Sequence, residues 1–404
     1  MAPTSPLRPS DWRAASRLAV DATEELTDLV EAVYAGIASP FATWGGLRPR
    51  RARGIAGLVY RTIHWVTRRV GRGLETAFQS LEPLLAEPAL SPGREGVVAA
   101  LNGVMGDTLA ARGNSLAIRM QVRQAGVAVP LERDALAAAF PEANGRLLVL
   151  LHGLCMSDLQ WNRRGHDHGA ALSRELGLTP IYLHYNTGLH VSTNGHAASA
   201  LLEGLVEAWP AAVEELTILG HSLGGLVARS AFHAATLAGH RWPARLRRIV
   251  FLGTPHHGAP LERGGQWFQI LLGGAPYAAP LARLGSLRSA GITDLRYGNV
   301  RDEDWRGVDR HARRGDRRVP LALPPGVDCH AVAATLGREV GDLRERLLAG
   351  DGLVPVASAL GDHTDPVRRL GIPEPHRFVG TGMGHLDLLD HPEVFAHLAA
   401  WLGA

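Results

Sequence analysis

One short segment, centred on Ser222, restricts the fold of this chain more than any other. The pentapeptide Gly220–Gly224 has the pattern Gly-x-Ser-x-Gly, follows the apolar run Leu216–Leu219 and precedes the helix-like segment Gly225–Phe232. A strand that turns this sharply into a helix leaves no room for a Cβ atom on either side of the serine. The strained turn also lifts the serine hydroxyl out of the sheet edge. The segment therefore predicts a strand–turn–helix unit that presents a nucleophilic serine.

A glycine-rich chain can contain this pentapeptide by chance, and 47 of the 404 residues here are glycine. Its context upstream supports a functional interpretation. The continuous apolar run Arg146–Leu151 is typical of a parallel strand buried on both faces, and it ends in His152-Gly153. The alternative is that His152-Gly153 only ends the strand.

Two further polar residues follow the serine in chain order. Asp351 stands on a glycine-rich loop after the strand-like run Asp328–Ala334, and His385 stands between glycines and a final helix. A carboxylate that orients a histidine, which in turn activates a serine, is the arrangement of a catalytic triad. Asp351 could instead be a turn residue, because Asp-Gly is a turn signal. Among 19 histidines, the competitors for the base are His376 and His391.

The region from about Ser115 to the C-terminus resembles the α/β-hydrolase superfamily, in its bacterial lipase and esterase branch. Residues 252–258 are similar to a Gly-Thr-Pro-His-x-Gly stretch of bacterial lipases, and residues 351–359 resemble their acid loop. Residues 185–195 are similar to hydrolases related to the glycosylphosphatidylinositol-deacylase group.

This resemblance implies hydrolysis of a carboxylic ester without a metal or an organic cofactor. Ser222, Asp351 and His385 would form the triad, and the backbone N–H groups of Leu154 and Leu223 would form the oxyanion hole. His221, inside the pentapeptide, is predicted to contact the substrate.

A long segment, about 259–326, separates two predicted strands and is predicted to be a cap over the site. Trp267, Phe268, Ile270 and Leu271 are its candidate substrate-binding residues, although they could equally form the core of the cap. The stretch Arg301–Arg318 carries both charge signs and is expected to be a solvated loop.

The hydrophobic periodicity changes near Gly113. Residues 1–113 are predicted to be an N-terminal helical region with three amphipathic helices, the third running from Ser91-Pro92 to Leu109. Residues 114–404 are predicted to be the α/β-hydrolase domain, which opens on an antiparallel hairpin from Ile118 to Val129. The fold class is α/β, with a mostly parallel, doubly wound sheet. Its remaining predicted strands are 146–151, 181–184, 216–219, 248–252, 329–333 and 377–379.

Charge and targeting signals exclude several classes of protein. The formal net charge is only +3. The chain contains arginine but no lysine, which indicates a compositional bias. No nucleic-acid partner is therefore expected. The two cysteines, Cys155 and Cys329, form no disulfide framework. We expect a cytoplasmic protein without a signal peptide. Basic residues flank the apolar stripe of the second helix, which could rest on an anionic membrane or pack against protein.

Three functions therefore remain open: a serine esterase or lipase, an acyltransferase or thioesterase with the same triad, and a lipid-binding module with an inactive site.

Overall fold

The computed structural model describes residues 92–259, 289–307, 316–339 and 350–404. The first two expected helices and residues 260–288 of the expected cap lie outside these ranges. By its contacts the chain forms two compact units. The larger unit comprises Glu95–Gly113 and Ala117–Ala404, and it is the one described below.

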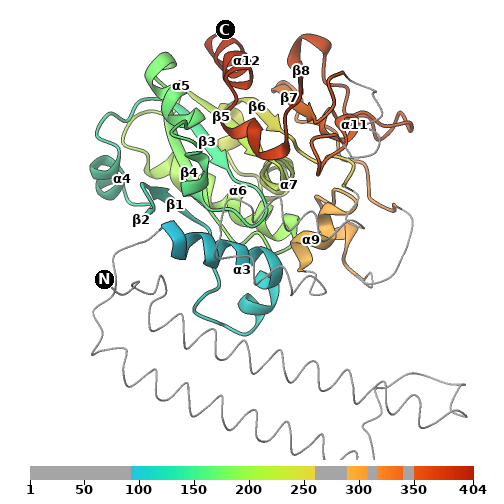
Figure 1. Ribbon diagram of the computed structural model, residues 1–404. Coiled ribbons are helices and arrows are strands. Elements are labelled where there is room, and N and C mark those ends of the chain that lie inside the picture. Colours follow the sequence, from blue (N-terminus) through green and yellow to red (C-terminus); the bar gives the residue numbers. More distant parts are fainter. Residues whose placement is uncertain (1–91, 260–288, 308–315, 340–349) are drawn as a thin grey trace, which may run out of the picture. The chain divides into compact units, whose positions relative to one another are not determined.

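An eight-stranded sheet organises the larger unit, with the strand order β2-β1-β4-β3-β5-β6-β7-β8 (Figure 1). Strand β1 is antiparallel to both β2 and β4, and every other neighbouring pair is parallel. The strands are β1 Gln121–Gln124, β2 Val127–Val129, β3 Arg146–Leu151, β4 Thr179–His184, β5 Glu215–His221, β6 Leu246–Leu252, β7 Asp328–Thr335 and β8 Arg377–Thr381. This is an α/β fold with a mostly parallel, doubly wound sheet, as the sequence predicted.

The central strands are buried on both faces because helices cover each side. Along β3, Val149 and Leu151 belong to one hydrophobic cluster, whereas Leu148 and Leu150 belong to another. The first cluster contains residues of α6 and α7, and the second contains residues of α5 and α12. Side chains of successive strand residues point to opposite faces, so a strand between two helical layers must be apolar at every position.

The helices are α3 Pro92–Ala111, α4 Arg133–Ala139, α5 His168–Leu176, α6 Val191–Ala208, α7 Leu223–Ala238, α9 Ala290–Leu295, α11 Val356–Ala359 and α12 Pro392–Gly403, with short 3₁₀ turns between several of them.

Helix α3 was grouped with the N-terminal region by the sequence, but its contacts place Glu95–Gly113 in the unit that carries the sheet. Two of its glycines explain the difference. A Cβ atom at Gly103 would lie 2.9 Å from the Cys155 backbone, and one at Gly106 would lie 2.7 Å from the Asn186 side chain. The helix therefore approaches the loops after β3 and β4 more closely than any larger residue allows.

Candidate active site

The turn between β5 and α7 holds Ser222 in a backbone conformation that side chains rarely adopt. Its φ is 55° and its ψ is −119°. Two hydrogen bonds keep it there: the Ser222 N–H donates to the Leu252 carbonyl oxygen at 2.8 Å, and the Gly225 N–H donates to the Ser222 carbonyl oxygen at 3.1 Å. Strain of this kind costs free energy, persists only when the surroundings enforce it and concentrates at functional sites.

Both glycines of the pentapeptide are required by close backbone approach. A Cβ atom at Gly220 would lie 2.6 Å from the Gly225 Cα atom. One at Gly224 would lie 2.7 Å from the Leu151 carbonyl carbon, inside the neighbouring strand β3. The pattern in the sequence therefore reflects the contact of α7 with the ends of β3 and β5.

The structure brings Asp351 and His385 together at the same edge of the sheet. The Nδ1 atom of His385 lies 2.7 Å from Oδ2 of Asp351, and both side chains are fully buried. The other carboxylate oxygen, Oδ1, accepts hydrogen bonds from the backbone N–H groups of Leu353 at 2.9 Å and Val354 at 2.8 Å. An ionised carboxylate with this many donors has a fixed orientation, and it holds the imidazole with Nδ1 protonated.

Ser222 and His385 both border the end of β6. The Ser222 N–H is bonded to Leu252, and a Cβ atom at Gly253 would lie 3.1 Å from Cε1 of His385. Within the described part of the chain, neither Oγ of Ser222 nor Nε2 of His385 has a hydrogen-bond partner, so the two are not bonded to one another. Catalytic hydrogen bonds are often long before a substrate binds and shorten in its complex.

The residues predicted to form the oxyanion hole border the serine. Leu223 is the first residue of α7, where the amide N–H groups have no intrahelical acceptor. Leu154 follows Gly153, and a Cβ atom on that glycine would lie 3.2 Å from Cβ of Ser222. The backbone at both positions therefore lies beside the serine, where an oxyanion would form.

The other sequence candidates have different surroundings. His221 is fully buried, its Nε2 lies 3.3 Å from the carbonyl oxygen of His385, and its ring packs against the His385 ring at 4.8 Å. His221 therefore packs against His385, and its predicted contact with a substrate stays a prediction. His391 caps α12 and His376 stacks on His330, so both have structural contacts. Trp267, Phe268, Ile270 and Leu271 lie outside the described residues.

Sequence reasoning missed a buried polar network behind the His152-Gly153 turn. Arg123 of β1 bonds through Nη1 to Glu95 of α3 at 2.9 Å and to Asp158 at 2.8 Å. His152 stacks on Tyr185 at 4.3 Å, and the Tyr185 hydroxyl donates to the His152 carbonyl oxygen at 2.5 Å. Burial lowers the pKa of His152 to about 4, so its ring is neutral at neutral pH. The network fixes the turn that precedes Leu154.

Within the described ranges no group of three or more His, Cys, Asp or Glu residues could hold a metal ion. None of the described helices combines the length and apolarity needed to span a membrane.

Residues 121–274 match a family model described as a domain of unknown function, DUF7379. The search of curated proteins gave no match. The mature form of the lipase BlEst2 from Bacillus licheniformis is 18% identical over 64% of this chain and 92% of that chain, with a TM-score of 0.42.

Two other solved structures are similar at the same level. A lipase-esterase related protein from Clostridium acetobutylicum is 11% identical over 65% of this chain and 94% of that chain, with a TM-score of 0.35. A Pyrococcus furiosus esterase is 14% identical over 65% and 82% of the two chains, with a TM-score of 0.36. Likeness at this level concerns the fold alone.

Proposed function

We propose that this protein is a serine hydrolase of carboxylic esters, an esterase or lipase that forms an acyl-enzyme on Ser222. The observation that carries the proposal is the buried contact of 2.7 Å between Asp351 and His385, at the edge of the sheet where the strained Ser222 turn also lies. The similar solved structures include a lipase and an esterase, which agrees with this reaction class.

In the proposed reaction, Nε2 of His385 takes the proton of Ser222 as Oγ attacks the ester carbonyl carbon. The negative charge on the carbonyl oxygen is stabilised by the N–H groups of Leu154 and Leu223, each contributing about 10²–10³ in rate. His385 then gives the proton to the leaving alcohol, and an acyl-enzyme remains on Ser222. Water repeats the sequence and releases the acid.

The test is hydrolysis of a series of p-nitrophenyl esters by the wild-type protein and by Ser222→Ala, together with labelling by a fluorophosphonate. We expect the substitution to lower kcat by at least about 10⁴-fold and to abolish the covalent adduct. A matched control is Ser230→Ala on the same helix, which removes another buried hydroxyl. Near-wild-type activity in Ser222→Ala would sink the proposal.

The same experiment separates hydrolysis from acyl transfer. Adding an alcohol or a thiol to the assay shows whether either outcompetes water for the acyl-enzyme. A protein that takes up fluorophosphonate but hydrolyses no ester of any chain length would favour the transferase or thioesterase alternatives. A protein that does neither would be a binding module.

A further inference from the structure

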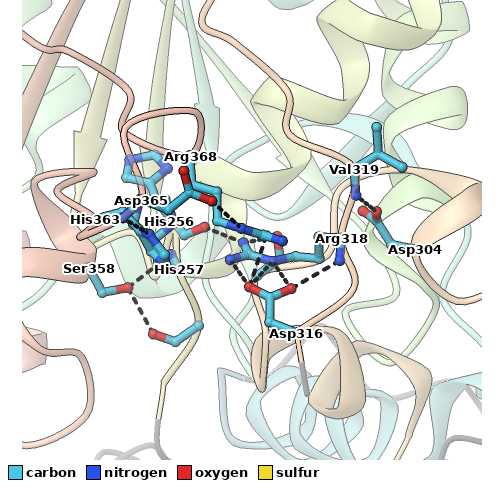
Figure 2. Close-up of polar contacts among 12 residues, drawn as sticks. His256, His257, Asp304, Asp316, Arg318, Val319, Ser358, His363, Asp365 and Arg368 are labelled. Atoms are coloured by element: carbon cyan, nitrogen blue, oxygen red, sulfur yellow. Dashed lines mark hydrogen bonds and ion pairs between the residues drawn. The ribbon is translucent and has the colours of Figure 1, made fainter. Parts of the chain in front are cut away.

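A pocket with a basic lining lies beyond the end of β6, beside α7. Its empty volume is about 290 Å³, including the part open to solvent, and its lining includes Arg229, His256, His257, Arg318, Leu321 and Arg368. Figure 2 shows the polar contacts around it, where Arg318 and Arg368 meet at Asp316. The sequence analysis placed Arg318 in a solvated loop. The described residues of that stretch are exposed or partly exposed, but the Arg318 side chain itself is only 9% exposed.

Two of the three arginines are occupied by acids and carbonyl groups. Arg318 bonds to Asp316 through Nε at 3.0 Å and through Nη2 at 2.7 Å, and its Nη1 donates to the His256 carbonyl oxygen at 2.7 Å. Arg368 bonds to Asp316 through Nη1 at 3.1 Å, and its Nε lies 3.5 Å from Asp365. These pairs neutralise their charges and fix one wall of the pocket.

Arg229 differs from both. It is 5% exposed, and within the described ranges no carboxylate lies within ion-pair distance of it. Its Nη2 donates to the Leu321 carbonyl oxygen and its Nη1 contacts Nδ1 of His256 at 3.4 Å, but its Nε has no partner. A buried guanidinium without an acid is costly, because burial removes hydration and no opposite charge compensates for it.

His256 supplies a second donor without a partner. It is fully buried, and burial together with Arg229 lowers its pKa well below the usual value, so the ring is neutral. Because Nδ1 accepts from Arg229, the ring proton is on Nε2, which has no hydrogen-bond partner in the described part of the chain. One positive charge and two buried donors therefore belong to side chains that line the same pocket.

We propose that this pocket binds a small oxyanion, a phosphate or carboxylate group, which pairs with Arg229. The planar guanidinium fork suits both groups. Arg229 stands six residues after Leu223 in α7, about 9 Å along the helix axis. The anion can therefore be a separate ligand or a part of the same substrate that Ser222 attacks. Binding itself does not depend on the proposed hydrolysis.

The direct test is calorimetric titration of the full chain with inorganic phosphate at constant ionic strength. We expect saturable binding that Arg229→Gln weakens by roughly 10- to 100-fold, the usual value of hydrogen bonds to a charged group. Arg229→Lys keeps the charge but loses the fork, so it should weaken binding less. The matched control is Arg247→Gln, an exposed arginine on β6, which should leave binding unchanged.

Three outcomes overturn the proposal: no saturable heat with the wild-type protein, equal affinity in Arg229→Gln, or equal losses in Arg229→Gln and Arg247→Gln. If Arg229→Gln does not fold, Arg368→Gln removes a cation from the more exposed wall of the pocket and should also weaken phosphate binding. Unchanged affinity there would then count against the site.

A kinetic comparison identifies the source of the anion. If the anion belongs to the substrate, Arg229→Gln should raise KM for an ester that carries a terminal carboxylate but not for its neutral analogue, and phosphate should compete only with the charged ester. If the anion is a separate ligand, phosphate should bind without competing with either ester. If the protein binds phosphate but hydrolyses no ester, the proposed anion site stands and only the proposed function fails.

Discussion

At the scale of single residues, His385 is held at three of its atoms. Its Nδ1 lies 2.7 Å from Asp351, its backbone N–H donates to the Asp351 carbonyl oxygen at 3.1 Å, and its own carbonyl oxygen lies 3.3 Å from Nε2 of His221. The ring can then have only one productive tautomer, with Nε2 left as the acceptor. His221 therefore contacts the backbone of His385, and its predicted contact with a substrate stays a prediction.

Asp351→Asn should keep this geometry and lose its charge. An amide can hold the imidazole in the wrong tautomer and cannot stabilise the imidazolium, so we expect kcat to fall by about 10⁴-fold with KM little changed. Steady-state kinetics on a p-nitrophenyl ester measures this. The control, Asp362→Asn, removes an acid that pairs with Arg377, remote from this carboxylate in the chain. Equal losses in both variants would point to a general effect on folding.

At the scale of elements, the helix after Ser222 is fixed by contacts that only glycine allows. Gly224→Ala would force a Cβ atom into the backbone of β3, so we expect a loss of stability of about 1–3 kcal/mol or more. Gly204→Ala is the matched comparison, because it lies inside α6 and its Cβ atom would meet only a Leu131 methyl group at 3.4 Å.

That second substitution should stabilise the protein by roughly 0.5–1 kcal/mol, since alanine loses less backbone entropy than glycine in a helix. Urea unfolding measures the free energy of unfolding of both variants, and the two changes should have opposite signs. No loss of stability in Gly224→Ala would show that α7 tolerates movement away from β3.

The elements themselves were largely predictable, and their long-range contacts were not. Strand β3 was predicted with its observed bounds because a strand buried on both faces is apolar throughout. The first hairpin strand was expected from Ile118 but begins at Gln121. Arg123 of this strand is buried between acids from α3 and the turn after β3. No local pattern encodes such a partner.

Arg229 shows the same limit, although one signal was present. It is the only charged residue in α7, where its neighbours are small or apolar, and it lies one turn after Gly225 on the face toward Thr254. A lone cation on a buried helix indicates a specific partner. Which carbonyl groups and acids surround it depends on segments far away in the chain.

At the scale of the whole molecule, several histidines are buried in the neutral form. Burial lowers the pKa values of His152 and His168 to about 4, whereas an unfolded histidine has a pKa of about 6.5. Between these values the unfolded chain binds protons that the folded chain does not. Their contribution is therefore fully present above about pH 6.5 and is lost as the pH falls toward 4.

We expect the free energy of unfolding to fall on acidification across this window, by about 1.4 kcal/mol per pH unit for each such histidine. His168→Gln should reduce the slope, because its ring is fully buried against the Leu388 carbonyl group. His196→Gln, at an exposed position on α6 where its ring lies 3.5 Å from Asp302, should change the slope less. Urea midpoints measured from pH 7.5 to pH 4 give the slope of the unfolding free energy against pH for each variant. A slope in His168→Gln identical to that of the wild type would contradict the assignment of His168 as buried in the neutral form.

The order of the three site residues along the chain has a consequence for biosynthesis. Ser222 follows β5 in the middle of the sheet, whereas Asp351 follows β7 and His385 follows β8, the outermost strand. Because a chain leaves the ribosome from its N-terminus, the turn that strains Ser222 can form around β3, β5 and β6 while the other two residues are still unmade. Under the proposed mechanism, a growing chain of this protein therefore presents its serine before the residue that would activate it has been made.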